Sequence, residues 1–290
     1  MYKNFGWLPD LPDFRDYDIY HPKVTEIMKK GTVSTSGLTS DEKLPDKVDL
    51  REYFSPIEDQ KNLGSCTSMA GVALIEYYER RAFGNHVDGS KLFLYKVTRN
   101  LLGLKGDTGA HIRSTMGAMV LFGIPPEKYW PYDIDAFDKE PPSFVYSLAQ
   151  NYKADLYFRL DCVLDRKVVL DCIKFFLSHG FPSMFGFVVY DSIIQATETG
   201  KIPFPEKTDK IRGGHALAAA GYDDSMVIQN DNGGYTTKGA FLIRNSWGKE
   251  WGEEGWGWLP YEYLLRGLAI DWWTVLSAKY VETNKFGIKS

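Results

Sequence analysis

An α+β fold is predicted for this chain from one long helix and two buried strands that lie far apart in the sequence. Apolar side chains recur at helical spacing over residues 66–81, which predicts the helix. A continuous apolar run at 216–220 predicts a buried strand that ends in a Gly-Tyr-Asp-Asp turn at 221–224. The alternating run at 240–244 predicts its neighbour, and 222–238 is expected to form the extended hairpin between the two strands.

Length and composition favour a globular protein and exclude several classes of partner. The 290 residues are 44% hydrophobic and 15% aromatic, which is enough for one large core or two lobes. The formal net charge of −4 provides no broad basic surface for nucleic acid. Since no run approaches about 18 apolar residues and the N-terminus lacks a signal-peptide pattern, we expect neither a membrane span nor secretion. We expect a monomer.

The cysteines favour a reducing, cytoplasm-like compartment. There are three of them, and Cys172 falls among apolar residues of a helix expected over 165–178. Burial as a small hydrophobe is therefore favoured over a disulfide with Cys162. The chain also contains no Asn-x-Ser/Thr glycosylation site, which agrees with a protein kept out of an oxidising compartment.

The remaining cysteine, Cys66, opens the helix predicted at 66–81 and is a candidate nucleophile. A thiol attacks a carbonyl as its thiolate, and the N–H groups and dipole at a helix N-terminus stabilise that charge. Gln60 precedes Cys66 by six residues on the loop that enters the helix, so its side-chain N–H can point back toward the sulfur. Together with the backbone N–H of Cys66, it would form a two-donor oxyanion hole.

A base and an orienting group follow in the second half of the chain. His215 stands after two glycines at the edge of the strand at 216–220, which is a suitable mount for a general base. Asn245 ends the strand at 240–244, and its side-chain carbonyl can accept a hydrogen bond from the histidine ring. Trp247 is large enough to shield that bond from water. The three segments together indicate a thiol hydrolase, which requires no metal and no organic cofactor.

These segments resemble the papain-like cysteine peptidases, the family that includes the cathepsins. Three short motifs carry the resemblance in the family's order: 60–66, 213–218 and 244–252. The interval from Cys66 is 149 residues to His215 and 179 to Asn245, whereas the family has about 130 to 150, which indicates inserted loops. The likeness extends from about residue 44 to residue 276.

The resemblance implies a papain-like two-lobe fold with the active site in the cleft between a helical lobe and an antiparallel, barrel-like sheet lobe. It implies an N-terminal extension at 1–43, a peptidase domain at 44–278 and a C-terminal tail at 279–290. Within the domain, about 51–152 would form the helical lobe and about 153–278 the sheet lobe.

The resemblance also implies how a substrate is held. Gly109 matches the first of a glycine pair that binds substrate backbone, and Ala110 replaces the second. Ala216 and Trp247 would complete the substrate-binding residues. His111 lies in the same loop as the pair and is weighed as a substrate contact, although a solvated loop histidine is the favoured interpretation.

The implied activity is hydrolysis of peptide bonds in polypeptide substrates, of the endopeptidase type, through an acyl-enzyme intermediate. Cys66, His215, Asn245 and Gln60 are its predicted catalytic residues. Two departures from the family signature leave these positions untouched: Leu63 replaces a cysteine and Thr67 replaces an aromatic residue. The first removes a disulfide, and the second alters the floor of the cleft.

Two alternatives from other functional classes use the same site. A catalytically silent relative would only bind peptides or a partner protein in the cleft, and labelling of the active-site thiol would identify it. A thiol acyltransferase would pass the acyl group to an amine, and product analysis with an added nucleophile would identify it.

The extension at 1–43 is a candidate inhibitory segment, since members of the family are commonly made as zymogens. It contains a short helical run near 24–30 and a Gly/Ser/Thr-rich stretch at 31–40. Our hypothesis is that the extension covers or braces the cleft and that the stretch is a processing site. The alternative, a structural wrap or a loose tail, is left open.

Overall fold

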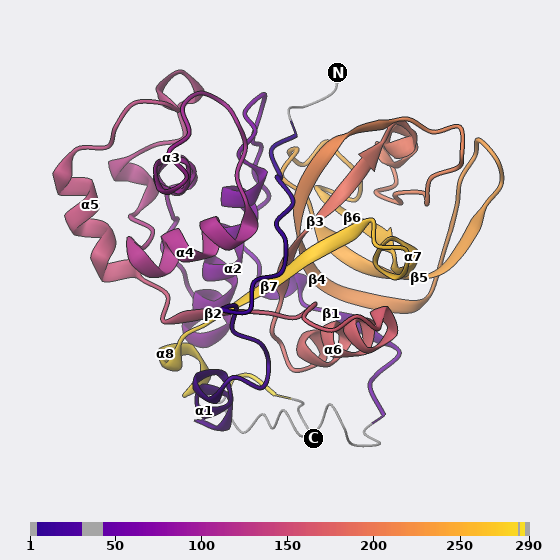
Figure 1. Ribbon diagram of the computed structural model, residues 1–290, viewed down its shortest axis with the longest axis horizontal. Coiled ribbons are helices and arrows are strands. Elements are labelled where there is room, and N and C mark those ends of the chain that lie inside the picture. The colour runs from indigo at the N-terminus through magenta and orange to yellow at the C-terminus, as the bar shows by residue number, and fades with distance from the viewer. Residues whose placement is uncertain (1–4, 31–42, 284, 288–290) are drawn as a thin grey trace.

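The computed structural model describes residues 5–30, 43–283 and 285–287 and confirms the α+β class (Figure 1). The α-helices are α1 (Pro22–Lys30), α2 (Cys66–Phe83), α3 (Lys91–Leu101), α4 (Ile112–Leu121), α5 (Ser143–Ala149), α6 (Arg166–Ser178), α7 (Tyr261–Leu265) and α8 (Ala278–Val281). The strands are β1 (Lys47–Asp49), β2 (Leu156–Arg159), β3 (Ser183–Tyr190), β4 (Ile211–Gln229), β5 (Thr236–Arg244), β6 (Trp256–Pro260) and β7 (Ala269–Leu276). Short 3₁₀ helices are η2 (Arg51–Tyr53), η3 (Glu127–Tyr129), η4 (Ile134–Ala136), η5 (Gln150–Tyr152) and η6 (Asp191–Ala196).

The elements form a helical lobe and a sheet lobe that lie side by side. Figure 1 shows α2, α3, α4 and α5 on one side and most of the sheet on the other, with the N-terminal segment running between them. The strand order is β2-β7-β3-β4-β5-β6, with β1 paired to β4, and every pairing is antiparallel. Because α2 packs against both β3 and β4, the first residue of this helix lies where the two lobes meet.

Aromatic residues fill the interior of the sheet lobe. The Trp272 ring stacks on Phe185 at 3.9 Å between ring centroids and lies 4.9 Å from Phe241. All three side chains are buried. Burial of a side chain of this size contributes roughly 1.5–3 kcal/mol, so these inward-facing rings help to hold β3, β5 and β7 together.

The strand that carries His215 is longer than the sequence pattern predicts. The predicted turn at 221–224 is wrong, because β4 continues to Gln229. Register shifts against β5 occur between Ala219 and Gly221 and between Asp223 and Val227, so the strand bends without ending. The interior of β4 gains a second partner from β1, where Val48 lies opposite Tyr222. The predicted hairpin is confirmed, since β4 and β5 pair as far as Gln229 and Thr236.

Both predicted long helices are present. The helix predicted at 66–81 is α2, which runs two residues further and ends at Gly84 in the left-handed conformation. The helix predicted at 165–178 is α6, and its N-cap Asp165 accepts a hydrogen bond from the backbone N–H of Lys167. Cys172 on this helix is buried and free, as predicted, and Cys162 is free and exposed.

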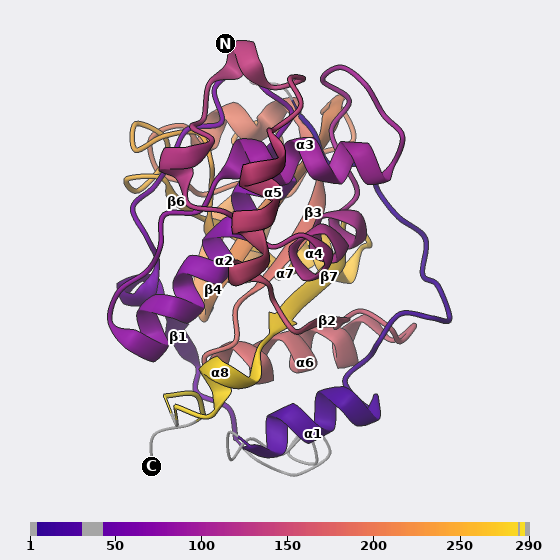
Figure 2. The same ribbon diagram turned by 90° about the vertical axis from the view of Figure 1, so that its left-hand side faces the viewer.

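The first and last helices of the described chain meet on one side of the molecule. Figure 2 shows α1, α6 and α8 gathered there, and α1 packs against α8. Tyr280, Val281 and Phe286 are buried, so the C-terminal segment packs against the domain. The Gly/Ser/Thr-rich stretch at 31–40, predicted as a processing site, lies outside the described residues.

Candidate active site

Cys66 is the first residue of α2 and is completely buried. Its Sγ accepts a hydrogen bond from the backbone N–H of Ala216 at 3.4 Å. Burial raises the pKa of the Cys66 thiol to about 11, while the backbone N–H groups of Ala216, Gly6, Thr67 and Cys66 itself oppose that rise. The N–H groups therefore favour a thiolate, but the closed surroundings of the sulfur keep it protonated.

His215 and Asn245 lie against each other on neighbouring strands. Nε2 of His215 is 2.9 Å from Oδ1 of Asn245, which also accepts the backbone N–H of Ser246 at 2.8 Å. An oxygen that accepts from the ring fixes Nε2 as the protonated nitrogen of a neutral imidazole. The Trp247 ring stacks on His215 at 4.8 Å between centroids with an interplanar angle of 28°, so it covers one face of the ring.

Gln60 is buried between the loop that precedes α2 and the loop that follows β5. Its Nε2 donates to the Leu63 carbonyl at 2.8 Å, and its Oε1 accepts from the Ser246 hydroxyl at 2.6 Å. Its backbone N–H donates to the Ser246 carbonyl at 2.8 Å. These bonds tie the approach to the nucleophile to the Asn245 loop, and the role of Gln60 as an oxyanion donor stays a prediction.

The loop with Gly109 and Ala110 is held beside the nucleophile by a tyrosine and a carboxylate that the sequence analysis missed. The Tyr95 hydroxyl donates to Asp107 Oδ1 at 2.6 Å and accepts the Gly109 N–H at 3.1 Å. Asp107 Oδ1 also accepts the Gly64 N–H at 2.9 Å. Tyr95 therefore connects the predicted substrate-binding loop to the turn that enters α2.

We expect Tyr95→Phe to lower the free energy of unfolding by about 1–3 kcal/mol, because it takes an acceptor from the buried Gly109 N–H and a donor from Asp107. Urea denaturation of the full chain measures this loss. Tyr129→Phe is the matched control, since Tyr129 is exposed and its loss should change stability by less than about 0.5 kcal/mol. Equal stability of the two variants would show that Tyr95 does not brace these loops.

Residues 5–16, which we call the N-terminal strap, lie directly over the site. The Ala110 N–H donates to the Gly6 carbonyl at 2.8 Å, and the Leu8 N–H donates to the Ala110 carbonyl at 3.1 Å. The Trp7 N–H donates to the Gly214 carbonyl at 3.0 Å. Both backbone groups of Ala110, predicted to bind substrate, are thus engaged by the strap.

The strap also covers the predicted catalytic side chains. The Phe5 ring lies 6.2 Å from the His215 ring and 6.2 Å from the Trp247 ring. Gly109 has a φ of +75°, and a Cβ on it would lie 2.3 Å from the Gly6 carbonyl oxygen, so only glycine admits the strap at this distance.

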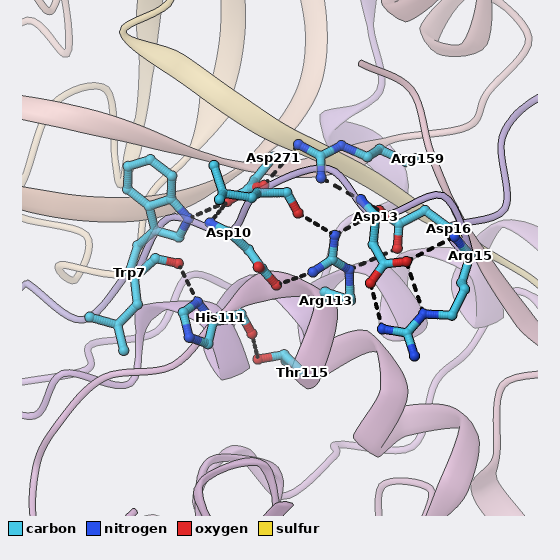
Figure 3. A network of polar contacts seen from close by, with 12 residues as sticks. Trp7, Asp10, Asp13, Arg15, Asp16, His111, Arg113, Thr115, Arg159 and Asp271 are labelled. Atoms are coloured by element: carbon cyan, nitrogen blue, oxygen red, sulfur yellow. Dashed lines mark hydrogen bonds and ion pairs between the residues drawn. The ribbon is translucent and has the colours of Figure 1, made fainter. Parts of the chain in front are cut away.

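His111 belongs to the strap contacts and is not a solvated loop residue, which corrects the interpretation favoured from the sequence. It is half-buried, and its Nδ1 lies 3.1 Å from the Leu8 carbonyl oxygen (Figure 3). The backbone of the strap runs past this histidine because Leu8 also pairs with Ala110.

An ionic network fixes the strap to the domain, as Figure 3 shows. Arg113 on α4 binds Asp10 and Asp16 of the strap, the latter at 2.7 Å. Asp271 on β7 accepts the Trp7 indole N–H at 3.2 Å and the Asp10 backbone N–H at 2.9 Å. The strap is therefore attached by charges as well as by backbone pairing.

The described residues contain no cluster of three or more His, Cys, Asp or Glu side chains that could hold a metal ion. Among the same residues, no helix is long and apolar enough to span a membrane.

The fold and this geometry define the class of protein: a two-lobed thiol hydrolase with a Cys, a His and an Asn gathered where the lobes meet. The family model described as "Papain family cysteine protease" matches residues 44–263, and the chain belongs to this family.

Relatives agree with this assignment. An uncharacterized peptidase C1-like protein of Acanthamoeba polyphaga mimivirus is 33% identical over 98% of this chain and 90% of its own length. The crystal structure of xylellain, a cysteine protease from Xylella fastidiosa, superposes with a TM-score of 0.74 at 34% identity, covering 95% of this chain and 96% of that one. A digestive procathepsin L 3 of Tenebrio molitor larval midgut shares the fold, with a TM-score of 0.61 at 21% identity over 82% of this chain and 72% of that one. The papain-like two-lobe fold is thereby confirmed.

Proposed function

We propose that this papain-family cysteine peptidase is an endopeptidase in which Cys66 is the nucleophile, His215 the base and Asn245 the residue that orients the base. One observation carries the proposal. The residue after His215, Ala216, donates its N–H to Cys66 Sγ at 3.4 Å, while Nε2 of His215 is 2.9 Å from Asn245 Oδ1. These contacts link segments that lie 150 residues apart in the chain, and they support a Cys-His-Asn site.

The proposed reaction has two halves. His215 takes the proton of the Cys66 thiol, and the resulting thiolate attacks the peptide carbonyl carbon. The charge that develops on the carbonyl oxygen is stabilised by the Cys66 N–H and by Gln60. The C–N bond then breaks as His215 gives a proton to the leaving amine, and an acyl thioester remains. His215 then takes a proton from a water molecule that attacks the thioester. The acid product leaves as His215 returns this proton to the Cys66 thiolate. Trp247 limits the access of solvent to the His215–Asn245 bond.

We also propose that the N-terminal strap inhibits the enzyme within its own chain. The strap engages the Ala110 backbone, its Gly6 N–H faces the sulfur, and its Phe5 ring packs near His215. A peptide substrate would need the same positions, so binding of the strap and of substrate should be mutually exclusive. The buried, protonated state of Cys66 beneath the strap fits a resting enzyme.

The nucleophile is tested by intact mass after treatment with a peptidyl epoxide directed at cysteine peptidases. Trp7→Ala in the full chain is the test protein, because it weakens the strap. We expect a single adduct that is absent from Trp7→Ala/Cys66→Ser and from the denatured chain, since only the folded site activates the thiol. The same adduct in the denatured chain, or in the Cys66→Ser variant, would refute the assignment of Cys66.

Product analysis of a long peptide tests the type of reaction. We expect internal cleavage with a free carboxylate at each new end. Release of residues from one terminus only would contradict endopeptidase action, and an acyl product joined to an added amine in place of the acid would indicate an acyltransferase. A chain that forms no adduct and no product would be a silent peptide-binding relative.

A further inference from the structure

The Trp7 indole occupies a flat slot beside the nucleophile. Trp7 is 5% exposed, and its backbone is bonded to Gly214, the residue before His215. A Cβ on Gly186 would lie 1.9 Å from Cε2 of the ring, and a Cβ on Gly214 would lie 2.7 Å from Cε3. The two glycines, which lie on the adjacent strands β3 and β4, therefore make room for a ring that any larger residue would exclude.

The slot ends at Asp271, a completely buried carboxylate on β7. Its Oδ1 accepts from the Arg159 guanidinium at 3.0 Å, and its Oδ2 accepts the Trp7 indole N–H at 3.2 Å and the Asp10 N–H at 2.9 Å (Figure 3). Burial raises the pKa of Asp271 to about 6, although the Asp10 N–H and the Arg159 charge oppose the rise. A carboxylate in such surroundings depends strongly on its hydrogen-bond donors.

The Trp7 indole N–H and the Asp10 N–H, which donate to Oδ2, both belong to the strap and leave with it. A substrate side chain that fills the slot in place of Trp7 must then supply a donor or leave a buried oxygen without one, which is costly. We infer that Asp271 is a specificity-determining residue, and that the slot binds a tryptophan side chain of the substrate near the scissile bond through its indole N–H. This inference rests on the proposed peptidase function and names the substrate class for it.

The local charges favour a neutral donor over a cation. When the strap leaves, it removes three carboxylates, Asp10, Asp13 and Asp16, together with the Arg15 guanidinium that pairs with Asp13. Two carboxylates and two guanidinium groups of the network remain: Asp161, Asp271, Arg113 and Arg159. Because these charges balance, an arginine or lysine side chain of the substrate would add an unpaired positive charge. An indole is neutral, fits the shape of the slot, and offers its one N–H to Oδ2 of Asp271.

The experiment uses the full-length Trp7→Ala chain, in which the slot is vacated. Peptide substrates are identical except for one residue, placed first or second on the acyl side of the scissile bond. That residue is Trp, 2-naphthylalanine, Leu or Arg; naphthylalanine matches the indole in size but has no N–H. We expect kcat/KM for Trp to exceed that for naphthylalanine by about ten- to a hundredfold at one of the two positions, and to exceed that for Arg.

A variant of the carboxylate gives an independent readout. Asp271 has a φ of +58°, which asparagine tolerates better than most residues, so Asp271→Asn is the conservative change. The asparagine oxygen must face the Arg159 guanidinium, so its NH₂ would face the indole N–H. Added to Trp7→Ala, Asp271→Asn should remove the preference for Trp over naphthylalanine. Asp16→Asn, which weakens the strap anchors on Arg113 and Arg159 but leaves Asp271 unchanged, should keep that preference.

The results separate this inference from the proposed function. Equal kcat/KM for Trp and naphthylalanine, or a preference for Arg, would overturn the inference even if the enzyme cleaves peptides. If the Asp271→Asn variant does not fold, the comparison of the Trp and naphthylalanine substrates decides by itself. If no peptide is cleaved and no epoxide adduct forms, the proposed function fails, and calorimetry with N-acetyltryptophanamide then tests the slot alone. Binding to Trp7→Ala that is lost in Trp7→Ala/Asp271→Asn would support the inference about the slot. Equal binding to the two variants, or no binding to either, would overturn that inference.

Discussion

Trp7→Ala in the full chain should raise the rate of alkylation of Cys66 by a peptidyl epoxide at least about tenfold. The indole is buried and hydrogen-bonded to Asp271, and truncation of a buried tryptophan typically costs about 3–5 kcal/mol. That cost falls on the state in which the strap is bound and not on the state in which it has left. Since about 1.4 kcal/mol is a factor of ten in an equilibrium constant, the open population should rise strongly.

The measurement is the second-order rate constant of adduct formation, followed by intact mass. Phe14→Ala is the matched control, because Phe14 lies on the same strap but is 98% exposed. We expect the control to react at the wild-type rate. If Trp7→Ala and wild type react equally fast, the strap does not limit access to the thiol, and residues 5–16 are a structural wrap.

The local patterns of the sequence predicted the elements that carry the site. The helix that begins at Cys66 and the buried strand at 216–220 depend on side-chain spacing within one segment, and spacing is visible in a sequence. The strand begins earlier than predicted, at Ile211, so His215 lies within it and not at its edge. The predicted burial of Cys172 follows the same logic. The turn predicted at 221–224 failed because partners on β1 and β5, distant in the chain, continue the strand through a glycine and two aspartates.

The contacts of the strap could not be predicted in the same way. An isolated tryptophan in a Pro/Asp-rich opening gives no local signal of its destination, and Asp271 looks like an interruption of an apolar strand. The available signals were the position of Asp271 between the apolar Ile270 and Trp272 and the aspartates of the strap, which need cationic partners. Arg113 and Arg159 supply those partners only after the lobes and the strap have come together.

His215→Ala, made in the Trp7→Ala background, should lower kcat for peptide hydrolysis by about 10⁴-fold or more, since the acceptor and donor of the proton are lost together. Cys66→Ser should lose a comparable amount. The double variant should be no worse than either single one, because a nucleophile without its base and a base without its nucleophile are equally ineffective. A double variant that loses the product of the two single effects would show that Cys66 and His215 do not act as one unit.

Two control variants separate a loss of proton transfer from a loss of packing. His86→Ala changes a half-buried histidine in the loop after α2 and should leave kcat unaltered. His215→Gln preserves more of the packing against Trp247 than alanine does, and it should be as inactive as His215→Ala if the imidazole acts as a base. Thermal unfolding of each variant establishes that the fold is intact. Full activity of the folded His215→Gln chain would mean that His215 only fills space beneath Trp247, and the proton transfers would then need a different group.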